Sequence, residues 1–224
     1  MKIYLTKNDK EFPISMNIRN FVPSEFNTGG AETFCMDTRI LNIIQTLRDI
    51  LGVQIVVNSG FRTEEYNKKV GGAKDSLHLK GMAIDFTLNS EGIAKYNILN
   101  VVSILHLLMK KNRVYDAGGI EVDIHPEKKN GWGYIHIDCR DDLWRAVRFA
   151  GGSYYTCNDL LDELSMNKAS VYAWQYMMNC LCRAGLKVDG IYGEKTRVAY
   201  VDLIKKVGYG LPTLLCFGLM NGEL

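Results

Sequence analysis

Two short segments of the chain carry side chains that can hold a metal ion. Residues 76–85 read S-x-H-x-x-G-x-A-x-D and contain His78 and Asp85, and residues 134–138 contain His136 about fifty positions later. Two imidazoles and one carboxylate form the ligand set of a catalytic zinc site, in which three protein ligands leave a fourth position open. The residue types therefore predict one catalytic zinc ion, bound by His78, Asp85 and His136, in a metallohydrolase.

The first two predicted ligands need a turn between them. His78 and Asp85 are too far apart in sequence to lie on one turn of a helix, unlike the histidine pair of an H-E-x-x-H metalloprotease. Gly81 can supply the turn that brings the chain back. Residues 82–86 then form a short apolar run typical of a strand, with Asp85 on the face opposite its two apolar neighbours.

The third predicted ligand lies in a segment that alternates between polar and apolar residues. In residues 133–139, Tyr134, His136 and Asp138 share one face of the expected strand, whereas Ile135 and Ile137 face the other side. A strand face with Tyr, His and Asp is typical of a site lining. A single His in an apolar strand is more often a packing residue, but two His with an Asp at this spacing favour a metal site.

Two further polar residues lie near this strand in sequence. Glu121 falls in the strand-like residues 118–122, which can pair with residues 133–139 as a hairpin, and it is equally well interpreted as a solvated acid. His125 follows in a loop-like stretch that ends at Pro126. We interpret His125 as part of a solvated turn, although it is near enough in sequence to approach the site.

Several short motifs occur together in an order that resembles the zinc D-Ala-D-Ala carboxypeptidase family. The resemblance is greater to its phage and bacterial branch of small murein peptidases, which includes endolysins, and it covers residues from about 15 to 150. The motifs are N-F-V-P-S-E-F at 20–26, S-G-F-R-T at 59–63, Y-N at 66–67, V-G-G-A at 70–73, S-x-H-x-x-G-x-A-x-D at 76–85 and I-H-I-D at 135–138.

The resemblance implies a fold, a reaction and a set of site residues. The fold is an α+β zinc peptidase domain of the Hedgehog and DD-peptidase type, with zinc on the three ligands named above. The reaction is cleavage of a peptide bond next to a D-amino acid in the peptidoglycan stem, of D,D- or L,D-type. Arg62 would hold a substrate carboxylate or carbonyl, and Ser76 and Tyr134 are the other predicted substrate-binding residues. The expected role is that of a phage endolysin in host cell lysis.

One position departs from the family pattern. Related enzymes often place Glu or Asp three residues before the last zinc His, as the general base that activates the attacking water, and here that position is Gly133. Asp138 is the first candidate for the base or for support of a zinc ligand, and Glu121 is the second. The missing acid also allows a different class of function, a non-catalytic wall-binding or structural protein on a degenerate peptidase fold. The three intact ligands argue against that alternative.

Composition and charge restrict the function classes. A chain of 224 residues with 47% hydrophobic and 10% aromatic residues is globular, and it is long enough for one mid-sized domain and a small second one. The net charge of +2, with scattered Lys and Arg, argues against nucleic acid as the main partner. No apolar run is long enough to cross a bilayer, so membrane insertion is not expected. Peptidoglycan is the expected partner, and we expect a monomer.

Cysteine usage and the N-terminus bear on localisation. The six Cys include no C-x-x-C pair, which favours buried thiols in a reducing cytosol. Residues 1–10 lack an apolar signal core. We therefore expect synthesis in the host cytoplasm without a signal peptide and action on the cell wall, reached with the help of a separate protein that permeabilises the membrane.

Elements before residue 150 follow an α+β order. A helix is predicted over 38–51, capped by Asp37 and ended by Gly52. A strand is predicted over 53–57, a helix after the cap residue Thr63, and one long helix from residue 89 or 90 to about 111. Together with the two strands that carry Glu121 and His136, these elements show no β-α-β repetition, which favours an α+β fold.

The character of the chain changes after residue 150. A linker is predicted at 151–156, followed by a helix over 171–181, a tight loop over 188–196 and a helix over 197–207. The pattern V-x-x-W-Q followed by D-G-x-x-G-x-x-T resembles a small three-helix peptidoglycan-binding module. We predict a peptidase domain over 1–152 and this module over 165–224. The alternative is a helical appendage that packs or dimerises.

Overall fold

The structure is a computed structural model. It describes residues 1–111, 118–125, 127–141, 143–149, 155–156, 171, 175–176, 178–179 and 183–207.

A six-stranded sheet lies at the centre of the fold, in the order β3-β4-β6-β5-β7-β8. Neighbouring strands run antiparallel except for the parallel pair β5 and β7. The strands are β3 (Ile55–Ser59), β4 (Ala83–Leu88), β5 (Gly118–Ile124), β6 (Trp132–Asp138), β7 (Leu143–Phe149) and β8 (Tyr155–Thr156). The antiparallel pairing of β5 with β6 confirms the predicted hairpin. A second sheet pairs β1 (Lys2–Thr6) with β2 (Thr33–Asp37).

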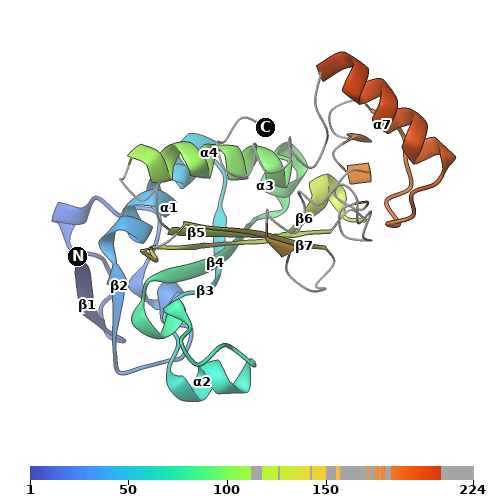
Figure 1. Cartoon of the computed structure of the whole chain (residues 1–224). Helices are drawn as coiled ribbons and strands as arrows, with labels where there is room; N and C mark the ends of the chain where they lie inside the picture. The colour runs from blue at the N-terminus through green and yellow to red at the C-terminus, as the bar shows by residue number, and fades with distance from the viewer. Residues whose placement is uncertain are drawn as a thin grey trace.

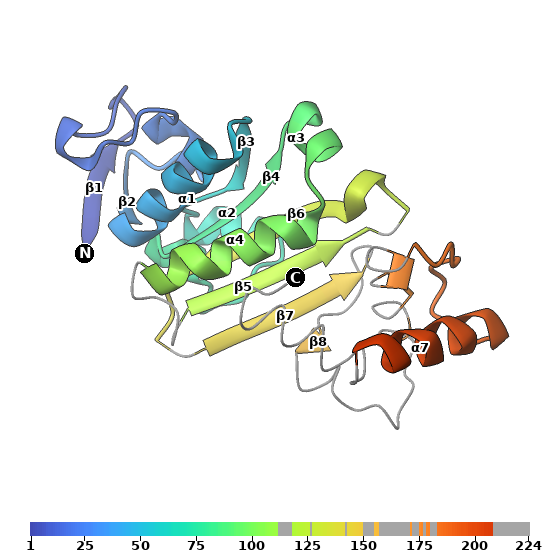
Figure 2. The ribbon, with the colours of Figure 1, turned by 90° about the horizontal axis from the view of Figure 1, so that it is seen from above.

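Helices cover the two faces of the larger sheet unequally. Figure 1 shows α1 (Thr38–Leu51), α3 (Ser90–Lys95) and α4 (Ile98–Lys111) on one side, and α2 (Glu64–Lys69) on the other. Seen from above, α4 crosses over the sheet, and α7 (Glu194–Val207) lies at the end of the molecule opposite β1 and β2 (Figure 2). Four short 3-10 helices within the described residues are η1 (Ile14–Met16), η2 (Pro23–Phe26), η3 (Leu77–Lys80) and η4 (Lys129–Gly131). Among the described residues, no helix has both the length and the apolar character needed to cross a membrane.

The main core lies between the sheet and the helices α1 and α4. Alternate residues of the central strands face this core and are almost completely buried, namely Ile84, Phe86, Ile120, Val122, Ile135 and Ile137. Burial of each such side chain contributes about 1.5–3 kcal/mol to folding. The period-two alternation of the strands then forces the intervening polar residues onto the opposite face of the sheet. The fold is therefore a mixed α and β domain whose polar strand face lies away from α1 and α4.

The termini of α1 and α2 are capped as the sequence predicts. The Asp37 Oδ1 accepts a hydrogen bond from the Arg39 backbone N–H at 2.9 Å at the start of α1, and Gly52 ends that helix with φ +65°. The Thr63 hydroxyl likewise accepts from the Tyr66 N–H at 3.1 Å at the start of α2. Both predicted caps are confirmed.

The prediction of one helix up to residue 111 is wrong, because the chain breaks into α3 and α4. Tyr96 lies between them in an extended conformation, with φ −116° and ψ 133°. Its carbonyl accepts a hydrogen bond from the indole N–H of Trp132 at 2.7 Å, and its hydroxyl donates to the Leu51 carbonyl at 2.8 Å. These two tertiary hydrogen bonds hold Tyr96 outside the helical conformation, and no local sequence pattern announces them.

Two elements after residue 150 differ from the prediction. Residues 155–156, expected in a linker, form β8 and pair with β7, so the sheet continues beyond residue 152. The last described helix begins at Glu194 instead of residue 197. Of the expected helix over 171–181, the described residues are helical, and its other residues lie outside the described part of the chain.

Candidate metal centre

His78 is presented by the short helix η3. Gly81 ends this helix with φ +64°, and a Cβ there would lie 1.9 Å from the Cys35 carbonyl oxygen, so the turn requires glycine. The His78 Nδ1 lies 2.8 Å from the Gly60 carbonyl oxygen. Because a carbonyl only accepts, Nδ1 carries a proton, and the second ring nitrogen, Nε2, lies 3.3 Å from the Asp85 Oδ1. His78 is buried and is thus held in one orientation.

Asp85 and His136 are direct neighbours across the sheet. Asp85 on β4 is in register with His136 on β6 and with Ser59 on β3. The His136 Nδ1 lies 2.7 Å from the Asp85 Oδ1. The other carboxylate oxygen, Oδ2, accepts a hydrogen bond from the Arg62 Nη2 at 2.7 Å. One oxygen of Asp85 therefore faces both imidazoles, while the second is held by a guanidinium.

The ligand atoms of His78, Asp85 and His136 converge within 4.8 Å of one another. Within the described residues, no other group of His, Cys, Asp and Glu converges in this way. Two imidazole nitrogens and a carboxylate oxygen suit zinc, and each imidazole is oriented through its other nitrogen, as is usual for metal-binding histidines. The residues present therefore fit the zinc ion that their types predict.

The electrostatics of this cluster favour a cation. Burial by itself would raise the pKa of Asp85, but hydrogen bonds from His136 and His78 hold it well below its usual range. Burial by itself would lower the pKa of His136, but hydrogen bonds to Asp138 and Asp85 raise it to about 10. The carboxylates around His136 thus stabilise positive charge at the place where the ligand atoms meet.

Asp138 lies behind His136, on the far side of the imidazole from Asp85. Its Oδ2 is 3.1 Å from the His136 Nε2. It is fully buried and also accepts hydrogen bonds from the Arg140 Nε at 3.0 Å and the Gly119 N–H at 2.8 Å. Burial would raise the pKa of Asp138, but the hydrogen bonds from His136 and Arg140 lower it. Of the two roles considered for Asp138, this geometry supports orientation of His136 more than acceptance of a proton from water.

Space for Asp138 depends on a glycine in the neighbouring strand. Gly119 on β5 is in register with Asp138 on β6. A Cβ at position 119 would lie 2.3 Å from the Asp138 Oδ2, and 2.7 Å from its carboxyl carbon. The absence of a side chain at Gly119 therefore lets the carboxylate of Asp138 lie over β5, within reach of the backbone N–H.

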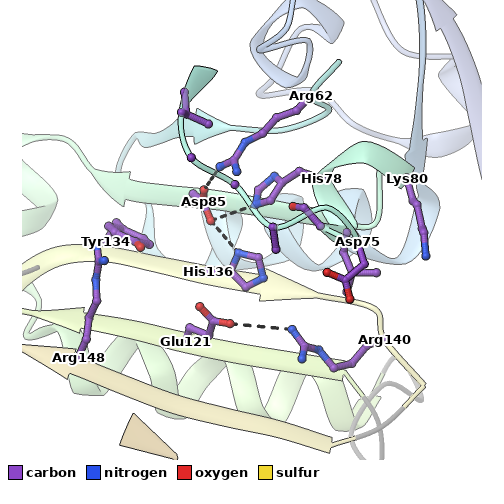
Figure 3. A pocket seen from close by; sticks show the side chains of 16 residues that line it. Arg62, Asp75, His78, Lys80, Asp85, Glu121, Tyr134, His136, Arg140 and Arg148 are labelled. Carbon is purple, nitrogen blue, oxygen red and sulfur yellow. Dashed lines mark hydrogen bonds and ion pairs between the residues drawn. The ribbon is translucent and has the colours of Figure 1, made fainter. Parts of the chain in front are cut away.

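Glu121 occupies the position beside His136 on the other neighbouring strand. The two residues are in register between β5 and β6, so their side chains leave the same face of the sheet. The Glu121 Oε1 lies 3.9 Å from the Arg140 Nη2. Asp85, His136 and Glu121 therefore form one row across three strands (Figure 3).

A cavity of about 840 Å³ opens over this row. Its floor includes the three predicted metal ligands and Glu121, and its wall includes residues 70–73 of the loop after α2. The three predicted substrate-binding residues, Arg62, Ser76 and Tyr134, all line it. The structure thus brings every predicted site residue except Asp138 to one cavity, and Asp138 lies behind the His136 ring.

Arg62 makes closer contacts to the metal ligands than the sequence predicts. Its Nη2 donates to Asp85, its Nε donates to the Ser59 hydroxyl at 2.7 Å, and its backbone N–H donates to the His78 carbonyl at 3.1 Å. Arg62 therefore ties two predicted ligands together. Its role in binding a substrate carboxylate or carbonyl stays a prediction.

Gly133 lies at an irregularity in the pairing of β5 with β6. The register passes from Asp123 opposite Tyr134 to Ile124 opposite Trp132, so Gly133 is an extra residue in β6, as in a β-bulge. A Cβ at 133 would lie 2.4 Å from the Asp123 carbonyl oxygen and 2.7 Å from the His125 ring. An acid at this position would require β5 to move, which accounts for the glycine.

His125 belongs to a separate cluster beside Gly133. Its Nδ1 lies 2.7 Å from the Glu127 Oε1, and its Nε2 lies 3.3 Å from the Asp123 Oδ2. It does not line the cavity above the metal ligands. The structure therefore places His125 outside the site, as expected.

Sequence reasoning missed three contributors to the site. Arg140 holds Asp138, the Gly60 carbonyl orients His78, and Gly119 leaves room for Asp138. Arg140 follows Asp138 by two residues. The alternation that places His136 and Asp138 on one face therefore also predicts Arg140 on that face. The other two contacts depend on strand register and chain packing, which leave no local signal.

One protein-family model matches part of the chain. Residues 19–107 match a family model described as Peptidase M15. The match supports a zinc metallopeptidase of the D-Ala-D-Ala carboxypeptidase type, and the matched segment contains Arg62, His78 and Asp85. His136 lies beyond it and is brought to the site by the pairing of β4 with β6. Comparison with curated proteins gives no match.

Proposed function

We propose that this protein is a zinc-dependent peptidase that hydrolyses peptidoglycan stem-peptide bonds next to a D-amino acid and serves as a phage endolysin. The observation that carries the proposal is the convergence of His78, Asp85 and His136 on the floor of a large cavity, together with the Peptidase M15 match. When bound there, zinc would polarise the substrate carbonyl and lower the pKa of water.

Glu121 is the general base of this proposal. It lines the cavity in the same row as His136 and Asp85, whereas Asp138 is buried behind His136 and already accepts hydrogen bonds from three residues. Glu121 would accept a proton from the attacking water as its oxygen bonds to the substrate carbonyl carbon. It would then give that proton to the leaving amine as the C–N bond breaks.

Asp138 has a positioning role in this proposal. Its hydrogen bond to the His136 Nε2 leaves the Nδ1 of that ring facing Asp85 and the cavity. Arg140 holds Asp138 in turn, so an unbroken chain of hydrogen bonds fixes the imidazole. Such support affects metal affinity more than it affects proton transfer.

The residues after 165 are proposed to bind the cell wall as a peptidoglycan-binding module. The described part supports a small folded unit, because the buried Gln175 side chain joins the helix that carries it to the loop before α7. This unit contacts the peptidase domain, where the Asn97 amide donates to the Tyr176 hydroxyl at 3.0 Å. Wall binding would raise the concentration of the peptidase at its substrate.

Turbidity loss of purified cell walls is the direct test of the proposed reaction. The zinc-loaded protein should clear walls, a chelator should stop the clearance, and added zinc should restore it. Mass spectrometry of the released fragments should show newly exposed amines of stem peptides. Wall binding without clearance or peptide release, at full zinc occupancy, would instead favour the non-catalytic wall-binding protein.

Glu121→Gln tests the assignment of the base. The substitution removes the proton acceptor and keeps the shape, so turnover should fall about 100-fold or more. Zinc content and the affinity for an uncleaved stem peptide, measured by calorimetry, should stay unchanged. Glu91→Gln, an exposed acid on α3, is the matched control and should keep full turnover. Asp75 is the acid of the cavity lining that is neither a predicted metal ligand nor the proposed base. If Asp75→Asn reduces turnover more than Glu121→Gln does, Asp75 is the base instead.

A further inference from the structure

The loop that forms one wall of the cavity has few side-chain contacts of its own. Residues 70–73 read V-G-G-A, and all four line the cavity. Val70, Gly71 and Ala73 are exposed. Glycine has no side chain to pack and loses much backbone entropy when it is ordered, so such a loop needs contacts from elsewhere to keep one conformation. These contacts come from α2, the helix that immediately precedes the loop.

Asn67 of α2 holds the loop through both its side chain and its backbone. Its Nδ2 donates to the Ala73 carbonyl at 2.8 Å, and its own backbone carbonyl accepts from the Gly72 N–H at 2.8 Å. The Ala73 carbonyl also accepts from the Ser76 N–H at 3.1 Å, at the start of the helix η3 that carries His78. One side chain thus joins α2 to the cavity wall and to Ser76, a predicted substrate-binding residue.

The environment of Asn67 indicates which of its groups is needed. It is the one buried residue of α2, at 4% exposure. Among the described residues, its Oδ1 has no hydrogen-bond partner, and it faces Gly72, where a Cβ would lie 2.1 Å away. An unpaired buried oxygen is unfavourable, and an apolar side chain would fill this place without that cost. The hydrogen bond that the amide donates to Ala73 is therefore what position 67 requires.

We propose that Asn67 is a positioning residue for substrate binding, which holds the 70–73 loop and Ser76 as the wall of the cavity. This inference rests on the proposed peptidase function and adds a residue that shapes its substrate site. It also gives the Y-N motif at 66–67 and the V-G-G-A motif at 70–73 a common purpose.

The proposed role concerns the substrate and not the metal. His78 is held by contacts that do not involve Asn67, because its Nδ1 donates to the Gly60 carbonyl and its own carbonyl accepts from the Arg62 N–H. Asp85 and His136 are fixed by the pairing of β4 with β6. Loss of the Asn67 amide would therefore weaken substrate binding and leave the metal ligands in place.

Asn67→Asp tests the proposal, because it removes the donor and keeps the shape of the side chain. With the zinc-loaded full-length protein and a soluble stem pentapeptide, KM should rise by about tenfold or more, and kcat should change by less than about threefold. Zinc content should stay stoichiometric. Asn42→Asp, which changes an exposed amide on α1 by the same charge, is the matched control and should alter neither constant. An unchanged KM would overturn the proposal.

Gly72→Ala disturbs the same contact from the loop. The added Cβ would push the Asn67 amide away from Ala73, so KM should rise although Asn67 is intact. Removal of the amide makes room for this Cβ. The double variant Asn67→Ala with Gly72→Ala should therefore raise KM no further than Asn67→Ala alone. Additive effects on KM would show that the two residues act separately, which contradicts the proposal.

Hydrogen exchange of the metal-free protein separates the role of Asn67 from the peptidase function. In Asn67→Asp, the backbone amides of residues 70–76 should exchange about tenfold faster or more, while those of β4 change far less. Equal acceleration in β4 would mean that Asn67 stabilises the whole fold, and the positioning role would be wrong. If the loop responds as expected but the parent protein cleaves neither walls nor peptides, Asn67 still holds the loop and the proposed peptidase function fails.

Discussion

Two buried polar clusters of this molecule differ in where their hydrogen-bonding groups point. Around Gln175, 2% exposed, the side-chain oxygen accepts from the Asp189 and Gly190 N–H groups, both at 2.9 Å. Its amide nitrogen donates to the Thr196 hydroxyl and to the Ile191 carbonyl. Every polar atom of this side chain is satisfied by the chain itself.

The metal cluster is arranged differently. His78 and His136 each use one ring nitrogen to contact the protein scaffold, through Gly60 and Asp138, and turn the other toward Asp85. The three ligand atoms meet beneath a cavity instead of closing on backbone groups. A polar cluster that closes on itself holds a fold together, whereas one that converges beneath a cavity is suited to a ligand. The following substitutions test this distinction, in order of decreasing effect on catalysis.

His78→Ala breaks the metal cluster itself. Loss of one of three ligands should remove stoichiometric zinc and reduce peptidase activity by about 1,000-fold or more. The thermal unfolding midpoint of the metal-free protein should change little, because the core between the sheet, α1 and α4 does not depend on this side chain. Metal analysis and calorimetry check both results. Full activity with stoichiometric zinc would remove His78 from the site.

Asp138→Asn changes a residue that shares features of both clusters. Asp138 is fully satisfied by the protein, as Gln175 is, yet it orients a metal ligand. An amide is a weaker acceptor for His136 and Arg140, so zinc affinity should fall about 10- to 100-fold. Turnover at saturating zinc should fall less than in Glu121→Gln. If turnover falls about 100-fold while zinc affinity is unchanged, Asp138 acts in proton transfer instead.

Arg62→Lys tests the guanidinium that joins the metal cluster to the cavity wall. Lys cannot contact Asp85 and Ser59 together with the planar geometry that Arg62 uses. Catalytic efficiency should fall about tenfold, or roughly 1.4 kcal/mol, with zinc retained. Steady-state kinetics of the zinc-loaded variant measure this. An unchanged rate would show that the contact to Asp85 has no catalytic consequence.

Gln175→Ala breaks the closed cluster and should leave catalysis almost intact. The backbone N–H groups of Asp189 and Gly190 lose their acceptor, so the unit that contains α7 should lose about 2 kcal/mol of stability. Hydrolysis of soluble peptides should change by less than about twofold, whereas retention on purified walls should drop. Denaturant unfolding and a wall pull-down measure the two effects. A large loss of soluble-peptide cleavage would mean that the two clusters are coupled.

Local sequence determined most of the elements and the residue types of the site. Capping residues and apolar periodicity predicted α1 from residue 38 to 51, and the alternation in residues 133–139 predicted that His136 and Asp138 share a face. The types of His78, Asp85 and His136 predicted the zinc ligand set. These inferences depend on interactions between residues close in sequence, which periodicity and capping rules capture.

Only the tertiary structure decided how these residues are used. It placed Asp138 behind the His136 ring and Glu121 in the row beside it, because strand register sets which groups face each other. It showed that a side chain at Gly133 would meet the carbonyl of Asp123, and that Tyr96 breaks the predicted helix to bind the Trp132 indole. Each of these outcomes depends on contacts between segments far apart in sequence. A local pattern holds no information on such contacts, so the roles of the acids followed from the fold.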